Sequence, residues 1–471
     1  MEHKQPPVQL GGVTCGRPHR GRVITSLGLA GQGLEGEITS SLENLTFLRT
    51  LNLSENSFSG RLPPLGRLGK LEVLDLSRNS LRDAIPDGIA NCSSLRILDL
   101  SDNSLVGELH LKLGLISDFS VLNLYQNRLT GTIPPSLGNM THLEELYLGN
   151  NSLSGSIPAE LGKLSNLSIL FLDKNSLSGG IPQSLLNLSS LRHLVLGHNK
   201  LGGVLLPNIG DALPNLRWLI LHDNSLVGEL HPKLGLLSGL SALDLHGNRL
   251  RGTIPPSLDN MTHLKVLGLE NNSLSGSIPA ELGKLSNLSI LSLGKNRLSG
   301  GIPRYLGNLQ QLRWMELDNN NLRGKIPVTL GNLQQLRLMD FSHSNLSGKI
   351  PRTLGNLQQL IMMNLSNNNL RGKIPVTLGN LQQLTLMDLS HNNLSGKIPR
   401  TLGNLQQLMW MDLNNNNLRG KIPRTLGNLQ QLSSMDLSHN NLEGDIPSNL
   451  GDLGLLYHLD LSDNKLKGII P

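Results

Sequence analysis

Residues 384–399 read LTLMDLSHNNLSGKIP, and the leucine spacing of this stretch decides the fold because it returns every 24 residues. The full pattern is L-x-x-L-x-L-x-x-N-x-L followed by x-G-x-I-P. Its central asparagine recurs from Asn79 to Asn464, with a shift by one residue at Asn224 and a skip at Ser344. A fixed period of this size predicts a solenoid of stacked coils in place of a globular core.

The first half of each coil is predicted to be a short strand. In the quoted stretch, Leu386–Ser390 alternates Met387 and Leu389, expected to point inward, with Leu386, Asp388 and Ser390, expected to point outward. Stacked copies would form a parallel sheet, and parallel pairing requires a return segment between strands. The remainder of the 24 residues supplies that segment.

The asparagine and the return segment have predicted roles of their own. The amide of Asn392 can satisfy buried backbone groups of neighbouring turns, so the asparagines should form a ladder. Ser344 should leave a gap in this ladder, and Gln32 fills the corresponding position of a degenerate first coil. Gly396 and Pro399 delimit a second extended stretch. The T-L-G-N-L-Q-Q-L segment that follows is expected to return as a short helical or 3₁₀ turn.

These motifs carry a family resemblance. The L-x-G-x-I-P segment resembles the plant-specific class of leucine-rich repeats, and about 19 copies cover nearly the whole chain. Residues 11–38, GGVTCGRPHRGRVITSLGLAGQGLEGEI, are similar to the cap junction of plant leucine-rich-repeat receptor kinases, particularly the pathogen-recognition subfamily of grasses. The resemblance implies an α/β repeat solenoid: a leucine-rich-repeat superhelix with a parallel β-sheet on its concave face, short second strands, and 3₁₀ or helical turns on its convex side.

The same resemblance predicts the domain organisation. Residues 1–22 are interpreted as a partly disordered remnant of the N-terminal cap, because only Gly12–Cys15 match the family's C-x-W-x-G-V-x-C motif. Residues 23–471 are expected to form one solenoid domain without a C-terminal cap. Cys15 and Cys92 lie several coils apart, so no disulfide between them is expected.

Composition limits the classes of partner and the compartment. The net charge is +6, but acids and bases are interspersed and aromatic residues make up only 3%, which argues against nucleic acid as a partner. Neither a secretory leader nor a membrane-spanning run is recognised, so contact with a membrane is expected only through segments absent from this chain. The resemblance nevertheless favours an extracellular or cell-surface location, with N-x-[ST] glycosylation candidates at Asn44, Asn91, Asn139, Asn166, Asn187, Asn260 and Asn287.

Catalytic chemistry is not favoured. Gly31–Gly36 matches G-x-G-x-x-G but coincides with the degenerate first coil, and no kinase motif follows it. Asp388, Ser390 and His391 imitate a hydrolytic triad, yet the set recurs along the repeat and no oxyanion hole accompanies it. No cluster of His, Cys or carboxylate residues shows metal-binding spacing. We therefore predict no enzyme activity, no metal and no cofactor.

The strongest candidate for a binding site is a set of departures from the repeat on the concave face. The central column of the sheet is mostly acid or amide, but four consecutive coils place apolar residues there, and neighbouring columns add aromatic and imidazole groups. Exposed apolar surface without a packing role often marks a binding site. The predicted ligand-binding residues are Tyr125, Tyr147, Phe171, His193, Val195, His198, Trp218, Ile220, His222 and His246.

A second candidate surface is a stripe of like charge on one flank. The x of G-x-I-P is lysine in five consecutive coils, which would attract an acidic partner or polysaccharide, although copying of one ancestral lysine explains the stripe equally well. The residues are Lys325, Lys349, Lys373, Lys397 and Lys421. In receptors of the resembled kind this flank contacts a leucine-rich-repeat coreceptor kinase.

Function is therefore expected to be recognition. The favoured hypothesis is the ectodomain, or a fragment of it, of a plant cell-surface receptor kinase or receptor-like protein in defence or developmental signalling, with a peptide or protein ligand on the concave face. Residues 102–182 recur nearly intact at 223–303, but Gly268 and Ser292 replace Tyr147 and Phe171 in the copy. Two alternatives stay open: a secreted inhibitor that resembles plant repeat proteins directed against pectin-cleaving enzymes, and a truncated paralogue without function.

Overall fold

The structure, a computed structural model, describes residues 12–16 and 23–468. It divides into two compact units, Met1–Leu226 (unit 1) and Val227–Pro471 (unit 2), and each is described by itself. The prediction of a single solenoid over residues 23–471 stays a prediction. Of the predicted cap remnant at 1–22, residues 12–16 are described, and the rest lies outside the described residues.

The first strands of unit 1 form one sheet. β1 pairs antiparallel with β2, and from β2 onward each first strand pairs in parallel with that of the next coil. These strands are β1 (Val13–Gly16), β2 (Val23–Gly28), β4 (Thr50–Asn52), β6 (Val73–Asp75), β8 (Ile97–Asp99), β10 (Val121–Asn123), β12 (Glu145–Tyr147), β14 (Ile169–Phe171), β16 (His193–Val195) and β18 (Trp218–Ile220).

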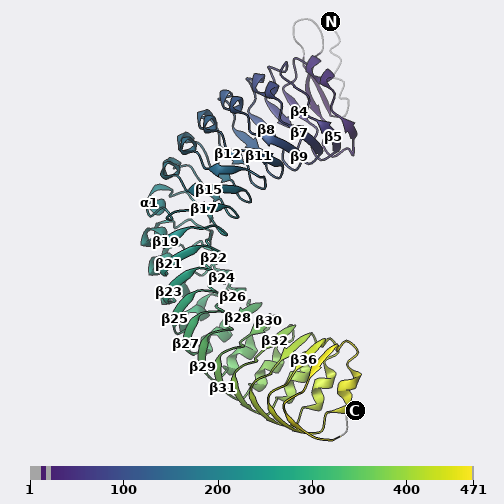
Figure 1. Ribbon diagram of the computed structural model, residues 1–471, viewed down its shortest axis with the longest axis vertical. Helices are drawn as coiled ribbons and strands as arrows, with labels where there is room; N and C mark the ends of the chain where they lie inside the picture. Colours follow the sequence, from purple (N-terminus) through teal and green to yellow (C-terminus); the bar gives the residue numbers. More distant parts are fainter. Residues whose placement is uncertain (1–11, 17–22, 469–471) are drawn as a thin grey trace, which may run out of the picture. The chain divides into compact units, whose positions relative to one another are not determined.

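The first strands of unit 2 are also parallel and in register, and Figure 1 shows β22 to β36 as a row of neighbouring strands. We call the solvent side of the first strands in either unit the sheet face. The strands of unit 2 are β20 (Ala242–Asp244), β22 (Val266–Gly268), β24 (Ile290–Ser292), β26 (Trp314–Glu316), β28 (Leu338–Asp340), β30 (Met362–Asn364), β32 (Leu386–Asp388), β34 (Trp410–Asp412), β36 (Ser434–Asp436) and β38 (His458–Asp460).

Second strands lead into the G-x-I-P segment of the repeat and pair in parallel between neighbouring coils. In unit 1 they are β3 (Glu35–Glu37), β5 (Ser57–Arg61), β7 (Ser80–Ala84), β9 (Ser104–Glu108), β11 (Arg128–Thr130), β13 (Ser154–Ser156), β15 (Ser176–Gly180) and β17 (Lys200–Gly202). In unit 2 they are β19 (Val227–Glu229), β21 (Arg249–Thr253), β23 (Ser273–Ser277), β25 (Arg297–Gly300), β27 (Asn321–Lys325), β29 (Asn345–Gly348), β31 (Asn369–Gly372), β33 (Asn393–Gly396), β35 (Asn417–Gly420), β37 (Asn441–Gly444) and β39 (Lys465–Leu466).

The return segments are short 3₁₀ helices, as predicted, and most begin after the proline of I-P. In unit 1 they are η1 (Ser40–Asn44), η2 (Asp87–Asn91), η3 (Leu111–Leu115), η4 (Pro135–Asn139), η5 (Ala159–Lys163) and η6 (Gln183–Asn187), with α1 (Ile209–Ala212) as a short α-helix. In unit 2 they are η7 (Pro232–Leu236), η8 (Pro256–Asn260), η9 (Ala280–Lys284), η10 (Arg304–Asn308), η11 (Val328–Asn332), η12 (Arg352–Asn356), η13 (Val376–Asn380), η14 (Arg400–Asn404), η15 (Arg424–Asn428) and η16 (Ser448–Asp452).

The predicted alternation of side chains is confirmed, with one correction. Met387 and Leu389 are fully buried, whereas Leu386 and Asp388 face the sheet surface and are partly exposed. Ser390, predicted to point outward, is only 4% exposed. Its amide and its hydroxyl both donate to Asp388 Oδ1, at 2.9 and 2.7 Å, so the serine folds back onto its own strand and ends it.

The asparagine ladder is present and each member makes several bonds. Asn392 is 7% exposed, and its Oδ1 accepts from Leu370 N of the preceding coil at 3.0 Å. Its Nδ2 donates to carbonyls of the preceding coil and of its own turn, those of Leu365, Leu389 and Ser390, at 3.0, 3.3 and 3.0 Å. One side chain therefore satisfies buried backbone groups of two coils.

The ladder departs from the predicted pattern at its first coil and matches it at Ser344. The ladder begins one coil earlier than predicted, because Asn56 accepts from Leu34 N at 2.9 Å and donates to Leu29 O at 2.7 Å. The gap predicted at Ser344 is confirmed, since Ser344 Oγ donates to Asn320 O at 3.3 Å and a serine has no amide to complete the set.

Unit 2 carries a column of carboxylates on its sheet face. Asp388, Asp412 and Asp436 lie in register on adjacent strands, and Asp412 Oδ1 accepts from Asn414 N at 2.9 Å. Burial, together with the negative charges of Asp388 and Asp436, raises the pKa of Asp412 to about 6. The ionised form of Asp412 is thus less stable in the folded chain than in water.

Replacing Asp412 with Asn is expected to make unit 2 more stable at neutral pH. The pKa of Asp412 is higher in the folded chain than in the unfolded chain. Asp412 therefore contributes its full stabilisation below the pKa that it has in the unfolded chain, and this stabilisation is lost as the pH rises through about 6. After allowance for solvent screening, we expect a gain of about 1 kcal/mol near pH 8 and none near pH 4, measured by denaturant unfolding. Asn364 already occupies this column and accepts from Ser366 N at 3.1 Å, so asparagine fits the site. An equal gain at both pH values would contradict the prediction.

Candidate functional site

The four apolar departures from the repeat form a continuous row on the sheet face of unit 1. β12, β14, β16 and β18 pair in register, so Tyr147 lies beside Phe171, Phe171 beside Val195, and Val195 beside Ile220. All four side chains are partly exposed, because the alternation of each strand assigns the neighbouring leucine to the core.

Aromatic rings join this row to the adjoining column. The rings of Tyr147 and Phe171 meet edge to face at a centroid distance of 5.2 Å, and Phe171 stacks on Trp218 at 6.5 Å. His193 lies 4.5 Å from Trp218. The exposed fraction of Trp218 is 41%, so the cluster offers its rings to solvent. We name the aromatic patch by its six members: Tyr147, Phe171, His193, Val195, Trp218 and Ile220.

The polar groups of the aromatic patch are held in their neutral forms. Tyr147 Oη donates to Glu145 Oε2 at 2.9 Å, and burial together with this bond raises the pKa of Tyr147. Burial, and then the charge of Arg192, lower the pKa of His193. At neutral pH the patch therefore presents a neutral imidazole and a neutral phenol beside its apolar groups.

A groove of about 530 Å³ adjoins one end of the aromatic patch. Tyr125, predicted as a contact residue, lies in this groove beside Tyr147 and Phe171. The rest of its wall is strongly acidic. The arginine of this wall, Arg78, is already paired with Glu55, and its Nε lies 3.9 Å from Asp102 Oδ2. We call it the acidic groove, and its lining residues are Ser54, Glu55, Asp75, Ser77, Arg78, Asp99, Ser101, Asp102, Asn123, Tyr125, Tyr147, Phe171, Asp173 and Val195.

Asp173 is the least satisfied group of the groove. Its Oδ1 is buried and has no hydrogen-bond partner within the part of the chain that the structure describes. Burial raises the pKa of this carboxyl group, against the opposing charges of Lys174, His222 and His198. Gly149 keeps this end open, because a Cβ at that position would lie 2.4 Å from Asp173 Oδ1. A donor or a cation would satisfy the free oxygen.

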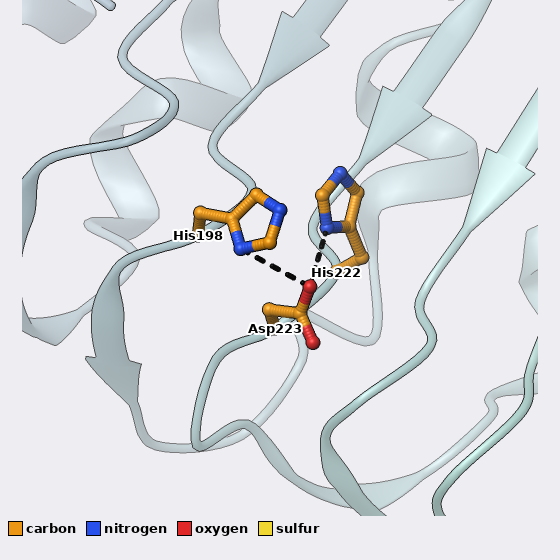
Figure 2. A group of neighbouring side chains, drawn as sticks. All are labelled: His198, His222 and Asp223. Carbon is orange, nitrogen blue, oxygen red and sulfur yellow. Dashed lines mark hydrogen bonds and ion pairs between the residues drawn. The ribbon is translucent and has the colours of Figure 1, made fainter. Parts of the chain in front are cut away.

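Three predicted contact residues lie apart from the aromatic patch. The Nδ1 atoms of His198 and His222 both approach Asp223 Oδ2 in unit 1 (Figure 2). His246 belongs to unit 2, where its Nδ1 lies 2.7 Å from Asp244 Oδ1. The assignment of all ten predicted residues to a ligand stays a prediction.

Sequence reasoning missed Asp173, Asp223 and the acidic wall. Asp173 occupies the position at which Ser77 and Ser101 end their strands, but Tyr125 and Gly149 occupy it in other coils, so an acid there gives only a weak signal in the sequence. Asp223 precedes Asn224, where the ladder shifts by one residue, and this irregular coil is the one signal of Asp223 in the sequence. Spacing along the chain does not reveal residues that meet only because coils stack.

The triad-like residues do not form a nucleophilic site. Ser390 Oγ donates to Asp388 Oδ1 at 2.7 Å, and the same bond recurs between Ser342 and Asp340. A serine activated as a nucleophile would instead donate to an imidazole. In these coils the Asp–Ser pair forms a turn that ends the strand.

The lysine stripe and the sequons occupy exposed positions. Lys325, Lys349, Lys373, Lys397 and Lys421 are all exposed on unit 2, and the stem of each covers the glycine of the next coil. A partner contact along this flank stays a prediction. All seven glycosylation candidates are exposed as well: Asn44, Asn91, Asn139, Asn166, Asn187, Asn260 and Asn287. Cys15 and Cys92 are both free.

Comparisons with known proteins agree with this architecture. A family model described as "Leucine-rich repeat region" matches residues 29–204. Models described as "Leucine rich repeat" match residues 238–298 and 383–442, and residues 311–333, 335–357 and 359–381. The plant peptide hormone receptor RGFR1, solved in complex with RGF2, superposes with a TM-score of 0.85 and 34% identity, over 93% of this chain and 74% of that one. The chain belongs to the leucine-rich-repeat family of plant receptor ectodomains.

Two further members of this family are informative. The Arabidopsis receptor kinase HAESA, solved with the peptide hormone IDA and the co-receptor SERK1, has a TM-score of 0.78 and 31% identity, over 100% of this chain and 90% of that one. The LRR receptor-like serine/threonine-protein kinase EFR of Arabidopsis thaliana is 51% identical over 71 residues, which are 15% of this chain and 7% of EFR. The alignment thus spans less than a tenth of that receptor kinase.

Proposed function

We propose that this chain is the ligand-recognition part of a plant cell-surface receptor and that it binds an extended peptide across the sheet face of unit 1. The observation that carries the proposal is the aromatic patch, a contiguous set of partly exposed rings next to a groove. Receptors of the same fold, RGFR1 and HAESA, were solved with peptide hormones, which supports a peptide as the ligand class.

The chemistry of the two surfaces suggests what the peptide carries. Trp218 and Phe171 would cover an apolar side chain, because a stacked pair of rings offers a large, rigid anchor. The acidic groove next to them would take a basic side chain or a terminal amine, since Asp99, Asp102 and Asp173 all line it. The proposed ligand is therefore an extended peptide with an apolar residue next to a cationic one.

The receptor would act by binding and not by catalysis, and it would act outside the cell. HAESA was solved as an LRR ectodomain, and the exposed sequon asparagines are compatible with passage through the secretory pathway. None of the helices formed by the described residues has the length and apolar character needed to cross a bilayer. A co-receptor kinase is the proposed second partner, with the lysine stripe of unit 2 as its candidate contact, by analogy with the HAESA complex that contains SERK1.

The test compares two tryptophans that occupy the same column of the repeat. Trp218 and Trp410 are each 41% exposed, but Trp218 stacks on Phe171 while Trp410 lies on β34 between Leu386 and Ser434. The purified chain is screened against fluorescent peptides that each carry one aromatic residue next to a lysine, and the tightest binder becomes the probe. Trp218→Ala should weaken its binding about 30-fold, the loss of a hot-spot residue, and Trp410→Ala should leave it unchanged.

A second variant uses the residue that the duplicated segment already carries. Phe171→Ser reproduces Ser292, which the same scaffold accepts in unit 2, so a loss of binding would not result from misfolding. Equal losses in Trp218→Ala and Trp410→Ala, or retained binding in both Trp218→Ala and Phe171→Ser, would exclude the aromatic patch as the site.

A further inference from the structure

Two imidazoles converge on one carboxylate oxygen at the end of unit 1. His198 Nδ1 lies 3.1 Å from Asp223 Oδ2, and His222 Nδ1 lies 3.2 Å from the same atom. The two rings stand edge to face with centroids 4.7 Å apart. Figure 2 shows both rings directed at the single oxygen. Other His–Asp pairs of the chain, such as His439 with Asp463 at 3.0 Å, bring one imidazole to a carboxylate.

The stacking of coils builds this arrangement. His198 N donates to His222 O at 2.9 Å, which fixes the register of the two turns and places the His198 side chain beside Asp223. His198 and Asp223 occupy the same left-handed position of successive coils, with φ of 51° and 49°, a conformation that His and Asp tolerate better than most residues. The ladder amides Asn199 and Asn224 brace these turns through the carbonyls of Gly197 and His222.

The donor atoms lie close enough together to bind one small transition-metal ion. The donor atoms of His198, His222 and Asp223 all lie within 4.8 Å of one another. In a tetrahedral zinc site with bonds of about 2.0–2.1 Å, neighbouring ligand atoms stand about 3.3 Å apart. The two N–O separations of 3.1 and 3.2 Å are therefore already close to those of a metal-bound set.

The ligand types and their surroundings also suit a cation. Two imidazoles and one carboxylate form a donor set that zinc accepts in proteins. The side chains of His198 and Asp223 are 51% and 37% exposed, so an ion can reach them from solvent, whereas His222 at 19% is held more firmly. Gly197 makes room for that ring, because a Cβ there would lie 2.7 Å from His222 Nε2.

We propose that His198, His222 and Asp223 bind one Zn²⁺ ion through the two Nδ1 atoms and a carboxylate oxygen of Asp223. Each imidazole would carry its proton on Nε2, which leaves the Nδ1 lone pair for the metal. The fourth position of the ion stays open to solvent or to a ligand group, as in zinc sites with three protein ligands. The proposal does not depend on peptide binding, because the chain alone supplies the three ligands.

The experiment is a titration of the metal-free chain with ZnCl₂, in which isothermal titration calorimetry measures the binding. Each variant substitutes a residue that other coils carry at the same position: His222→Ser follows Ser101, and His198→Asn follows Asn150. The matched control is His391→Asn. His391 shares the left-handed position, with φ of 49°, but the residues in that position of the two neighbouring coils are Asn367 and Asn415, which are neither imidazoles nor carboxylates. Circular dichroism confirms that each variant is folded.

We expect one saturable Zn²⁺ site in the unmodified chain and in His391→Asn. The Zn²⁺ affinity should fall at least about tenfold in both His198→Asn and His222→Ser. Titration with Co²⁺ as the probe should give the strong visible absorption of a tetrahedral site, lost in the same two variants. Absence of saturable Zn²⁺ binding, or equal affinity in His222→Ser and His391→Asn, would overturn the proposal and leave two histidine–aspartate ion pairs. Peptide binding measured in the presence of a chelator reports on the proposed function separately.

Discussion

Replacing Asn392 with alanine is expected to lower the unfolding free energy of unit 2 by about 3 kcal/mol, because a buried donor or acceptor without a partner costs about 1–3 kcal/mol. The substitution removes the acceptor of Leu370 N and a donor to Leu365 O, both in the preceding coil. Water cannot replace the amide easily, since Asn392 is only 7% exposed. The damage should thus extend to both coils that the side chain joins.

Denaturant unfolding and hydrogen exchange of the two affected coils measure this effect. Asn404→Ala is the control, because Asn404 is exposed at the end of η14, and we expect it to cost less than about 0.5 kcal/mol. Ser344→Asn is the converse change, which should complete the ladder and raise stability by about 1 kcal/mol. Similar unfolding free energies in Asn392→Ala and Asn404→Ala would contradict the prediction, because the hydrogen bonds of the ladder amide would then contribute little to stability.

Replacing Gly403 with alanine is the second large effect that we expect, and intrinsic helix propensity predicts the opposite sign. Alanine favours a helical turn over glycine by up to about 1 kcal/mol. In η14, however, a Cβ at Gly403 would lie 2.2 Å from Thr425 O, a backbone atom of the next coil that cannot rotate away. The two coils must separate, so we expect a net loss of about 2–3 kcal/mol, in the range of overpacked cores.

Gly451 is the matched control for this substitution. It occupies the same position of its coil in η16, but a Cβ there would meet no atom within 4 Å. Gly451→Ala should therefore be neutral or stabilising by a few tenths of a kcal/mol. Hydrogen exchange should show lower protection in the coils on both sides of residue 403 and unchanged protection in Gly451→Ala. A Gly403→Ala variant that is more stable than the unmodified chain would contradict the prediction and show that the two coils can separate without a loss of unfolding free energy.

Most of the fold could be predicted because its physical determinants are local and repeated. The burial of Met387 and Leu389 on one face of the strand, the return turn and the ladder role of Asn392 all follow from one 24-residue period. Ser390 was placed wrongly because alternation alone ignores that a hydroxyl two residues after a carboxylate can donate back to it. Strand length was overestimated for the same reason.

The candidate site could be predicted only where its residues share a column. Tyr147 and Phe171 were found because both break the same column in consecutive coils, and in-register pairing then made them neighbours. Asp173 and Asp223 belong to columns whose usual occupants are variable polar residues, so neither stood out. Their significance comes from burial and from the neighbouring coil, which depend on three-dimensional packing and not on periodicity.

Identical contacts between coils also bear on how such a chain can evolve. Within each unit most coils meet the next through the same glycine, the same amide and strands in the same register, so the two faces of such a coil are interchangeable. A crossover between misaligned copies that adds or removes 24 codons joins compatible faces and yields a chain that still folds. Residues 102–182 recur nearly intact at 223–303, an offset of 121 residues (five coils of 24 plus the one-residue shift at Asn224), and one copy carries Phe171 where the other has Ser292. Recombination can therefore bring new side chains together on the sheet face in a single event, without passing through an unstable intermediate.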